Sequence, residues 1–311
     1  MMTNIRAATK KIGIVGFGCI GSYLCYLLDD KQTKVFVRRT ASPIKPTLSV
    51  DGERKALKTQ RCYFSEKSLH ALDLLIVPVK SYQNAELIKQ LRPILPQSIP
   101  ILILQNGISG IEEFRQAFPY NEIFAGISTD GLYRQSIDSV VLAGRGKLLI
   151  GQIQDKKQSC KGLASAKKLM SRHPHGEWSD NIKEQIYQKL LVNCVINPLT
   201  FLYDCKNGEV VKYTNECEEI INEVLGVFAH ERVHISPDSA LTRVLEVIRA
   251  TAKNTSSMLQ DKLGEKPTEI DAILGAIIQK ANHYQCPVKK VEQLYQAVKQ
   301  QEQRYLNTAN R

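Results

Sequence analysis

The sequence lacks the cysteine patterns that mark metal sites. Its eight cysteines include no CxxC pair, and none is grouped with histidine at metal-ligand spacing. Several lie inside apolar runs, where a free thiol packs as a small hydrophobic group. This pattern favours a reducing cytoplasm and no structural metal.

Long apolar segments are also scarce. The run IGIVGFGCIGSYLCYLL, residues 12–28, resembles the core of a signal peptide in length and lack of charge. Its four glycines disfavour a continuous helix and no small-residue cleavage site follows, so we expect no secretion signal. No other segment is long and apolar enough to span a bilayer. We found no internal repeat and no low-complexity tract.

The charge balance is basic, with 42 Lys and Arg against 31 Asp and Glu. Such a surplus can serve nucleic acid, an anionic membrane or anionic small molecules. The basic residues are scattered without interleaved aromatic residues, so we expect neither a nucleic-acid nor a membrane partner. A small anionic substrate and a simply basic surface both remain open, as do a monomer and a homodimer.

The chain is long enough for two domains, because 311 residues exceed what one core usually serves. Strand and helix alternate in the first half, which predicts a doubly wound parallel sheet with a β-rich edge at 122–151. Beyond Gly176 helical periodicity takes over. We therefore predict an α/β Rossmann-like domain over 1–176 and an all-helical domain over 177–311. Strands are expected at 11–15, 34–39, 73–79 and 99–107, a hairpin turn at Asp51-Gly52, and helices at 19–30, 81–91, 111–118, 180–197, 215–233, 238–263, 268–284 and 288–306.

A glycine motif follows the first predicted strand. GFGCIG comprises Gly16, Phe17, Gly18, Cys19, Ile20 and Gly21, and it fits G-x-G-x-x-G. The motif alone is weak, but here it ends a strand and opens a helix, as a pyrophosphate-binding turn requires. The alternative is a glycine-rich loop without a ligand.

The second predicted strand ends in Arg38 and Arg39. An enzyme that prefers NAD usually carries an acidic residue there to bind the ribose 2′-hydroxyl. Two guanidinium groups instead suit a 2′-phosphate, since they form bidentate, charge-assisted bonds. The sequence thus favours NADP, with solvated basic residues as the alternative.

The segment KLLVNCVINPLT, residues 189–200, places Lys189, Asn193 and Asn197 four residues apart. These positions share one helix face, and the intervening residues are apolar. We expect a buried helix whose polar stripe binds a ligand, and we expect the helix to end or kink at Pro198.

Other polar residues are ambiguous when taken singly. Lys80 and Asn106 are expected at the carboxyl ends of strands, where ligands bind, but each is also an ordinary loop residue. Asn254 and Ser257 are expected on one helix face, as a solvated surface or as part of a site. Thr268 is expected to cap a helix, and Glu269 then has a structural reason to occupy its first turn.

Together these segments resemble the ketopantoate reductase family over nearly the whole chain. The motifs are GFGCIG, VPVKSYQ, LQNGISGIEEF, KLLVNCVINPLT, CKNGE and NTSSMLQD followed by TEID. The resemblance implies reduction of 2-dehydropantoate to (R)-pantoate with NADPH, in pantothenate biosynthesis, with the site in a cleft between two domains.

The resemblance also implies roles for individual residues. Lys189 is the expected general acid, and Glu269 is expected beside Lys189 and the cofactor. The expected substrate contacts are Asn106, Lys189, Asn193, Asn197, Asn207 and Ser257. The expected cofactor contacts are the glycine motif, Arg38 or Arg39, Lys80, Asn106 and Glu269. The segment around Leu132, where a backbone contact to the cofactor is expected, aligns poorly.

Two alternatives remain at this stage. One is a reductase of another 2-oxo acid on the same scaffold, which would have least need of Asn207 and Ser257. The other is a non-catalytic NADP-sensing regulator, which would have no need of the Lys189 stripe.

Overall fold

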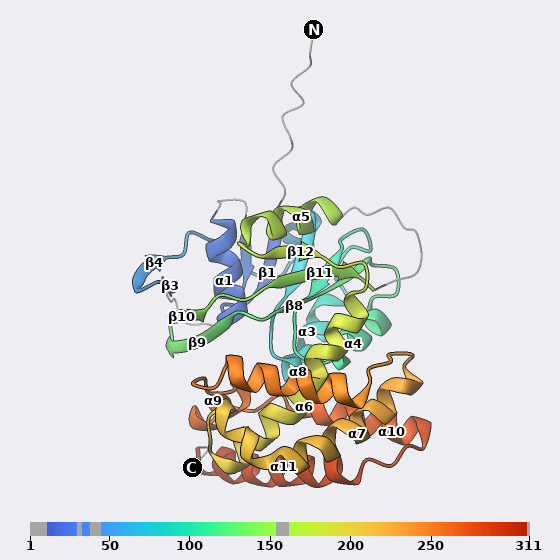
Figure 1. Ribbon diagram of the computed structural model, residues 1–311. Coiled ribbons are helices and arrows are strands. Elements are labelled where there is room, and N and C mark those ends of the chain that lie inside the picture. The colour runs from blue at the N-terminus through green and yellow to red at the C-terminus, as the bar shows by residue number, and fades with distance from the viewer. Residues whose placement is uncertain (1–10, 30–32, 38–44, 154–161, 310–311) are drawn as a thin grey trace. The chain divides into compact units, whose positions relative to one another are not determined.

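The chain divides into two compact units in the computed structural model, which describes residues 11–29, 33–37, 45–153 and 162–309 (Figure 1). The first unit extends to Ile182 and leaves out residues 106–109, which belong with the second unit. The sequence suggested a division after residue 176. The structure divides the chain after Ile182 because strand β12 (Gly176–Trp178) pairs with β11 (Leu148–Gln152) in the first unit.

The first unit is built on an eight-stranded sheet in the order β12-β11-β8-β7-β6-β1-β2-β5. From β5 to β8 the strands are parallel, whereas β11 runs antiparallel to β8. The Rossmann-like sheet predicted from the sequence is therefore confirmed. The remaining strands of this sheet are β1 (Ile12–Val15), β2 (Lys34–Phe36), β5 (Gln60–Cys62), β6 (Leu74–Val77), β7 (Ile101–Ile103) and β8 (Ile123–Ser128), and the helices are α1 (Cys19–Leu28), α2 (Glu66–His70), α3 (Asn84–Leu91), α4 (Ser109–Ala117) and α5 (Leu163–Arg172).

One predicted helix start differs in detail. The helix expected at 81–91 begins with a 3₁₀ turn, η1 (Ser81–Gln83), that leads into α3. The apolar composition of the strands explains their burial. All four residues of β6 are buried, as in a strand covered on both faces by helices.

A second sheet lies in the same unit, in the order β4-β3-β10-β9. The expected hairpin joins β3 (Thr47–Val50) to β4 (Glu53–Ala56) through Asp51 and Gly52, both with positive φ, 51° and 84°. Strand β10 (Ser139–Gly144) pairs parallel with β3 and antiparallel with β9 (Gly131–Ser136). The segment 122–151, predicted as one sheet edge, is thus shared between two sheets.

Helix α1 is buried on two sides, which explains its uniformly apolar sequence. Leu24 and Leu28 pack in the core of the large sheet. Tyr23 and Leu27 pack with residues of β3 and β10, including Leu48. A helix that is apolar all round needs such cover. Among the described residues, none of the helices has the length and apolar character needed to cross a membrane.

The second unit is helical, as predicted, and two of its boundaries differ from the prediction. The region 238–263 is two helices rather than one, because residues 251–253 form a turn, residues 254–256 have no regular structure, and Ser256 caps the second helix. The helix expected from 268 opens with a π-helical turn. The elements are α6 (Ile182–Tyr203), the 3₁₀ segment η2 (Asn207–Tyr213), α7 (Thr214–His230), α8 (Pro237–Ala250), α9 (Ser257–Leu263), the π turn η3 (Asp271–Gly275), α10 (Ala276–Tyr284) and α11 (Lys289–Ala309).

Helix α6 does not end at Pro198, which was one of the two outcomes, an end or a kink, expected from the sequence. It continues to Tyr203, and Leu199 and Phe201 are fully buried beyond the proline. An interior proline costs about 3 kcal/mol, whereas burying each of these side chains contributes about 1.5–3 kcal/mol. The hydroxyl of Thr200 also lies 2.8 Å from the carbonyl oxygen of Ile196, where it acts as a donor. Packing therefore overrides the local preference.

A partly buried carboxylate joins three helices of this unit. Glu231, at the end of α7, accepts hydrogen bonds from Tyr187 of α6 and from Lys280 and Tyr284 of α10, at 2.8, 2.9 and 2.8 Å. Burial raises the pKa of Glu231, but these three donors more than offset the effect and lower it to about 2. The charged form is therefore stabilised by folding.

We expect Glu231→Gln to lower the free energy of unfolding by about 3 kcal/mol at pH 7, because it removes the ion pair with Lys280, whose side chains are only 12% and 15% exposed. The folded pKa lies below the usual value of 4.5, so this contribution is complete above pH 4.5 and is lost as the pH falls toward 2. Urea unfolding at pH 7 and pH 3 measures both effects.

Glu177→Gln is the matched control, since its ion pair with Lys147 is exposed on both sides. An exposed pair contributes less than about 1 kcal/mol. Equal losses in the two variants would contradict the assigned role of Glu231.

Candidate active site

The loop between β1 and α1 has the backbone geometry that its glycines suggested. Gly16 has a φ of +79°, and its N–H donates to the Phe36 carbonyl on β2 at 2.9 Å. A Cβ on Gly21 would lie 2.3 Å from the carbonyl oxygen of Gly16. Both positions therefore require glycine, the first for the turn and the last for close packing of the helix.

The middle glycine faces open space. A Cβ on Gly18 would have no heavy atom within 4 Å, and Gly18 caps α1 without any side-chain hydrogen bond. A ligand can therefore approach the backbone closely at Gly18, and the N-terminal end of a helix such as α1 favours an anion. These residues fit the pyrophosphate of a dinucleotide.

The carbonyl of Phe17 is held from outside the loop. Arg134 of β9 donates to it from Nη2 at 2.5 Å, and Nη1 of the same residue donates to the Ile137 carbonyl at 2.7 Å. The hydroxyl of Ser22 lies 3.4 Å from the Phe17 oxygen. Arg134 was not predicted, because a contact between residues 117 positions apart leaves no local pattern.

Lys80 lies three residues after the end of β6, which pairs with β1. The carboxyl ends of parallel neighbours meet at one sheet edge, so Lys80 and the glycine loop share that edge, as predicted. Arg38 and Arg39 lie outside the described residues, and their expected contact with a 2′-phosphate stays a prediction.

Asn106 and Glu269 are brought together although they are 163 positions apart. The amide nitrogen of Asn106 donates to Glu269 Oε2 at 2.9 Å, and Glu269 is 5% exposed. The next residue, Gly107, has a φ of +81°, and a Cβ there would lie 2.2 Å from the Ala272 carbonyl oxygen. Gly107 therefore packs closely against the backbone of Ala272, which follows Glu269 in the chain.

Hydrogen bonds hold the residues on both sides of Glu269. Before it, the N–H of Thr268 donates to Glu302 at 2.6 Å, and the Thr268 hydroxyl accepts from the N–H of Ile270 at 3.3 Å, as a helix cap should. After it, Asp271 accepts from Tyr295 at 2.6 Å and from Lys299 at 3.0 Å. Glu269 is thus fixed by its neighbours as well as by Asn106.

The polar stripe of α6 is present as predicted. Lys189 and Asn193 are partly exposed, whereas Asn197, one turn further, is 5% exposed. The side-chain nitrogen of Asn197 is buried and has no hydrogen-bond partner among the residues that the structure describes. Buried polar atoms are nearly always paired, so this donor needs an explanation.

Asn207 presents the complementary atom. Its nitrogen donates to the Thr251 hydroxyl at 2.9 Å, and that hydroxyl donates to the Val247 carbonyl at 2.7 Å, which fixes the orientation of the amide. The amide oxygen of Asn207 is then left buried, and within the described part of the chain it has no partner. Asn197 thus offers an unused donor and Asn207 an unused acceptor.

The turn between α8 and α9 supports Asn207. The N–H of Asn207 donates to the Asn254 carbonyl at 3.0 Å, so Asn254 acts through its backbone and does not share a helix face with Ser257 as expected. Ser257 is exposed at the first turn of α9. Its neighbour Ser256 is buried, caps α9 and lies 2.6 Å from the Thr200 hydroxyl.

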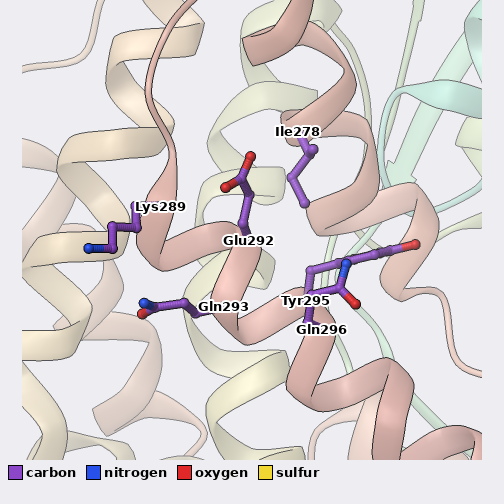
Figure 2. Close-up of a pocket in the computed structure, with 6 residues that line it drawn as sticks. All are labelled: Ile278, Lys289, Glu292, Gln293, Tyr295 and Gln296. Atoms are coloured by element: carbon purple, nitrogen blue, oxygen red, sulfur yellow. The ribbon is translucent and has the colours of Figure 1, made fainter.

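A surface hollow elsewhere in the second unit contains none of these residues. It lies between α10 and α11 and is lined by Ile278, Lys289, Glu292, Gln293, Tyr295 and Gln296 (Figure 2). Tyr295 is already bonded to Asp271. The hollow carries none of the predicted chemistry.

Comparisons with known proteins cover both units. The family model described as "Ketopantoate reductase PanE/ApbA" matches residues 12–155, and the model of its C-terminal part matches residues 181–302. A 2-dehydropantoate 2-reductase of Yersinia pestis is 35% identical over 95% of this chain and 96% of its own.

Solved structures agree in fold. A probable 2-dehydropantoate 2-reductase of Bacillus subtilis is 27% identical, with a TM-score of 0.76 over 93% of this chain and 99% of its own. A D-mandelate dehydrogenase solved with NADH and anilino(oxo)acetate is 22% identical, with a TM-score of 0.84 over 94% of this chain and 99% of its own.

A Rossmann-like unit with an open glycine loop, joined to a helical unit with a lysine and amide stripe, defines a nicotinamide-dependent oxidoreductase. The family models match most of the chain, and a relative above 30% identity spans nearly all of it. The chain belongs to the ketopantoate reductase family, whose members are NADP-dependent oxidoreductases. The resemblance stated from the sequence is thereby confirmed.

A substitution of Arg134 tests whether this residue holds the glycine loop in place. Arg134→Ala removes the charge-assisted bond to the Phe17 carbonyl, so the loop must be ordered when the nucleotide binds. We expect Kd for NADPH and for NADH to rise by the same factor, about tenfold for a loss of about 1.4 kcal/mol. Isothermal titration calorimetry with each nucleotide measures this, and an unchanged Kd for both would contradict the role.

Asn197→Leu tests the unused donor. In the free protein the substitution removes a buried unpaired group, so we expect unfolding free energy to be unchanged or raised by up to about 1 kcal/mol. We expect KM for the substrate to rise at least about tenfold if the donor serves a ligand. Urea unfolding and steady-state kinetics give the two values, and a clear loss of stability with unchanged KM would show a purely structural role.

Proposed function

We propose that the protein reduces 2-dehydropantoate to (R)-pantoate with NADPH, in pantothenate biosynthesis. The observation that carries the proposal is the pair of unused amide atoms, the donor on Asn197 and the acceptor on Asn207. A protein keeps such atoms unpaired at a cost of about 1–3 kcal/mol each. A ligand that supplies both an acceptor and a donor accounts for them.

The substrate has the matching groups. 2-Dehydropantoate carries a carboxylate and a ketone, which accept hydrogen bonds, and a hydroxyl, which donates one. The Asn197 amide is suited to an acceptor oxygen and the Asn207 oxygen to the hydroxyl. Asn193 and Ser257 complete the proposed set of substrate contacts, and Asn106 contributes where the substrate meets the cofactor.

Lys189 is the proposed general acid. It lies two turns before Asn197 on the same face of α6 and is partly exposed. Reduction of a ketone produces alkoxide charge, which an ammonium group stabilises and then neutralises by transferring its proton to that oxygen. The adjacent amides orient the substrate without adding charge that would compete with Lys189.

NADPH, when bound, supplies the hydride to the ketone carbon. The proposed contacts in this chain are the backbone of the 16–21 loop for the pyrophosphate and Lys80 for the nucleotide, with Arg38 or Arg39 as a predicted contact. Asn106 and Glu269 act as a bonded pair, in which the amide holds the carboxylate in place. We assign Glu269 the task of fixing the cofactor and Lys189.

Two alternatives stay distinguishable. A reductase of an aromatic 2-oxo acid would bind a substrate with no hydroxyl, so the acceptor on Asn207 would remain unused. A regulator that only senses NADP has no need for Lys189. We propose a cytoplasmic location, because the sequence has no CxxC pair and several cysteines are buried as small hydrophobic groups. We propose a monomer or a homodimer.

Lys189→Ala removes the proposed proton donor. We expect kcat to fall by about 10²–10⁴-fold while Kd for NADPH changes little, because the lysine acts on the substrate oxygen. Steady-state kinetics give kcat, and calorimetry gives Kd for NADPH. Turnover close to that of the unmodified protein would refute the assignment of Lys189.

The reaction itself is tested by nicotinamide absorbance with 2-dehydropantoate and NADPH or NADH. Rapid loss with NADPH and little with NADH supports the proposal. Turnover only with phenylglyoxylate would favour the other 2-oxo acid reductase. Binding of NADPH without turnover of either acid would favour the regulator.

A further inference from the structure

Arg61 lies at the same sheet edge as the glycine loop. It belongs to β5, the outermost strand of the large sheet, which pairs parallel with β2 in the register Val35↔Arg61. The N–H of Val37 donates to the Cys62 carbonyl at 3.1 Å, so the two strands stay paired to their carboxyl ends. Arg61 is therefore opposite the middle residue of β2, one residue before the carboxyl end of that strand.

The side chain of Arg61 reaches beyond β2. Its guanidinium carbon lies 5.7 Å from the centroid of the Phe17 ring, in the glycine loop. The strand order β1-β2-β5 puts β2 between them, and neighbouring strands are about 4.8 Å apart. The guanidinium therefore reaches across β2 toward the glycine loop, where it makes a cation–π contact with Phe17.

In doubly wound folds, residues near this position recognise the nucleotide. The adenosine ribose lies at the end of the second strand, and its 2′ substituent is recognised there. A guanidinium group binds phosphate oxygens in bidentate fashion, and stacking on a ring fixes its plane. We propose that Arg61 binds the 2′-phosphate of NADPH and thereby sets the preference for NADPH over NADH.

The inference rests on the proposed use of NADPH but assigns a residue from a third strand, which no motif indicated. Arg134 supplies a contrast within the same loop. Both of its terminal nitrogens donate to backbone carbonyls, so it acts on the loop and not on the 2′ substituent. Arg61 contacts the ring face of Phe17, and Arg134 its carbonyl.

The experiment measures Kd by calorimetry for NADPH, NADH, adenosine 2′,5′-bisphosphate and 5′-AMP, with the full chain and the variants Arg61→Gln, Arg61→Lys and Arg134→Ala. For Arg61→Gln we expect Kd to rise at least tenfold for NADPH and for the bisphosphate. We expect Kd to change less than twofold for NADH and 5′-AMP. Arg61→Lys keeps the charge but loses the bidentate geometry of the guanidinium group. We therefore expect Kd for NADPH to rise less than in Arg61→Gln.

The outcomes separate the two proposals. Equal rises for all four nucleotides in Arg61→Gln, like those expected for Arg134→Ala, would overturn the inference and make Arg61 a structural residue. Unchanged NADPH binding in that variant would overturn it as well. Failure of the unmodified protein to bind NADPH would instead refute the proposed function. If Arg61→Gln does not fold, Arg61→Lys decides by its ratio of NADPH to NADH affinity, which must fall.

Discussion

The placement of Glu269 is the constraint on which much of the second unit depends. A carboxylate that is 5% exposed is stable only when donors face it, and Asn106 supplies one at 2.9 Å. The bond draws residues 106–109, which follow β7, into the helical unit, and only glycine at 107 fits against Ala272. The position of Asn106 is therefore decided by the helical unit, although its strand belongs to the sheet.

Sequence periodicity predicted the features that depend on local chemistry. The buried strands, the glycine turn with Gly16 at positive φ, and the Asp51-Gly52 hairpin follow from residues close in the chain. The helical character of the second half followed for the same reason. The differences from the prediction occurred where tertiary packing outweighs local preference. Burial around Leu199 and Phe201 carries α6 past Pro198, and the non-local pairing of β3 with β10 forms a sheet that no local pattern indicated.

In the candidate site, too, local features were predicted and contacts between distant residues were not. Spacing was enough to align Lys189, Asn193 and Asn197 on one face, because four residues make about one helical turn. It could not tell that the Asn197 nitrogen lacks a partner, or that Thr251 orients Asn207. It also missed Arg134 and Arg61, which meet at Phe17 from strands distant in sequence. The roles of all these site residues in binding and catalysis remain predictions.

The pairing of β3 with β10 has a consequence for synthesis of the chain. Thr47 lies opposite Ser139, so the inner edge of the β3–β4 hairpin has no strand to pair with until β10 has emerged from the ribosome. At about 5–20 residues per second, that interval is roughly 5–20 s. During this time α1 is covered on one side only, and Tyr23 and Leu27 lack part of their core. The second sheet thus makes early folding of the nucleotide loop depend on chain that is translated much later.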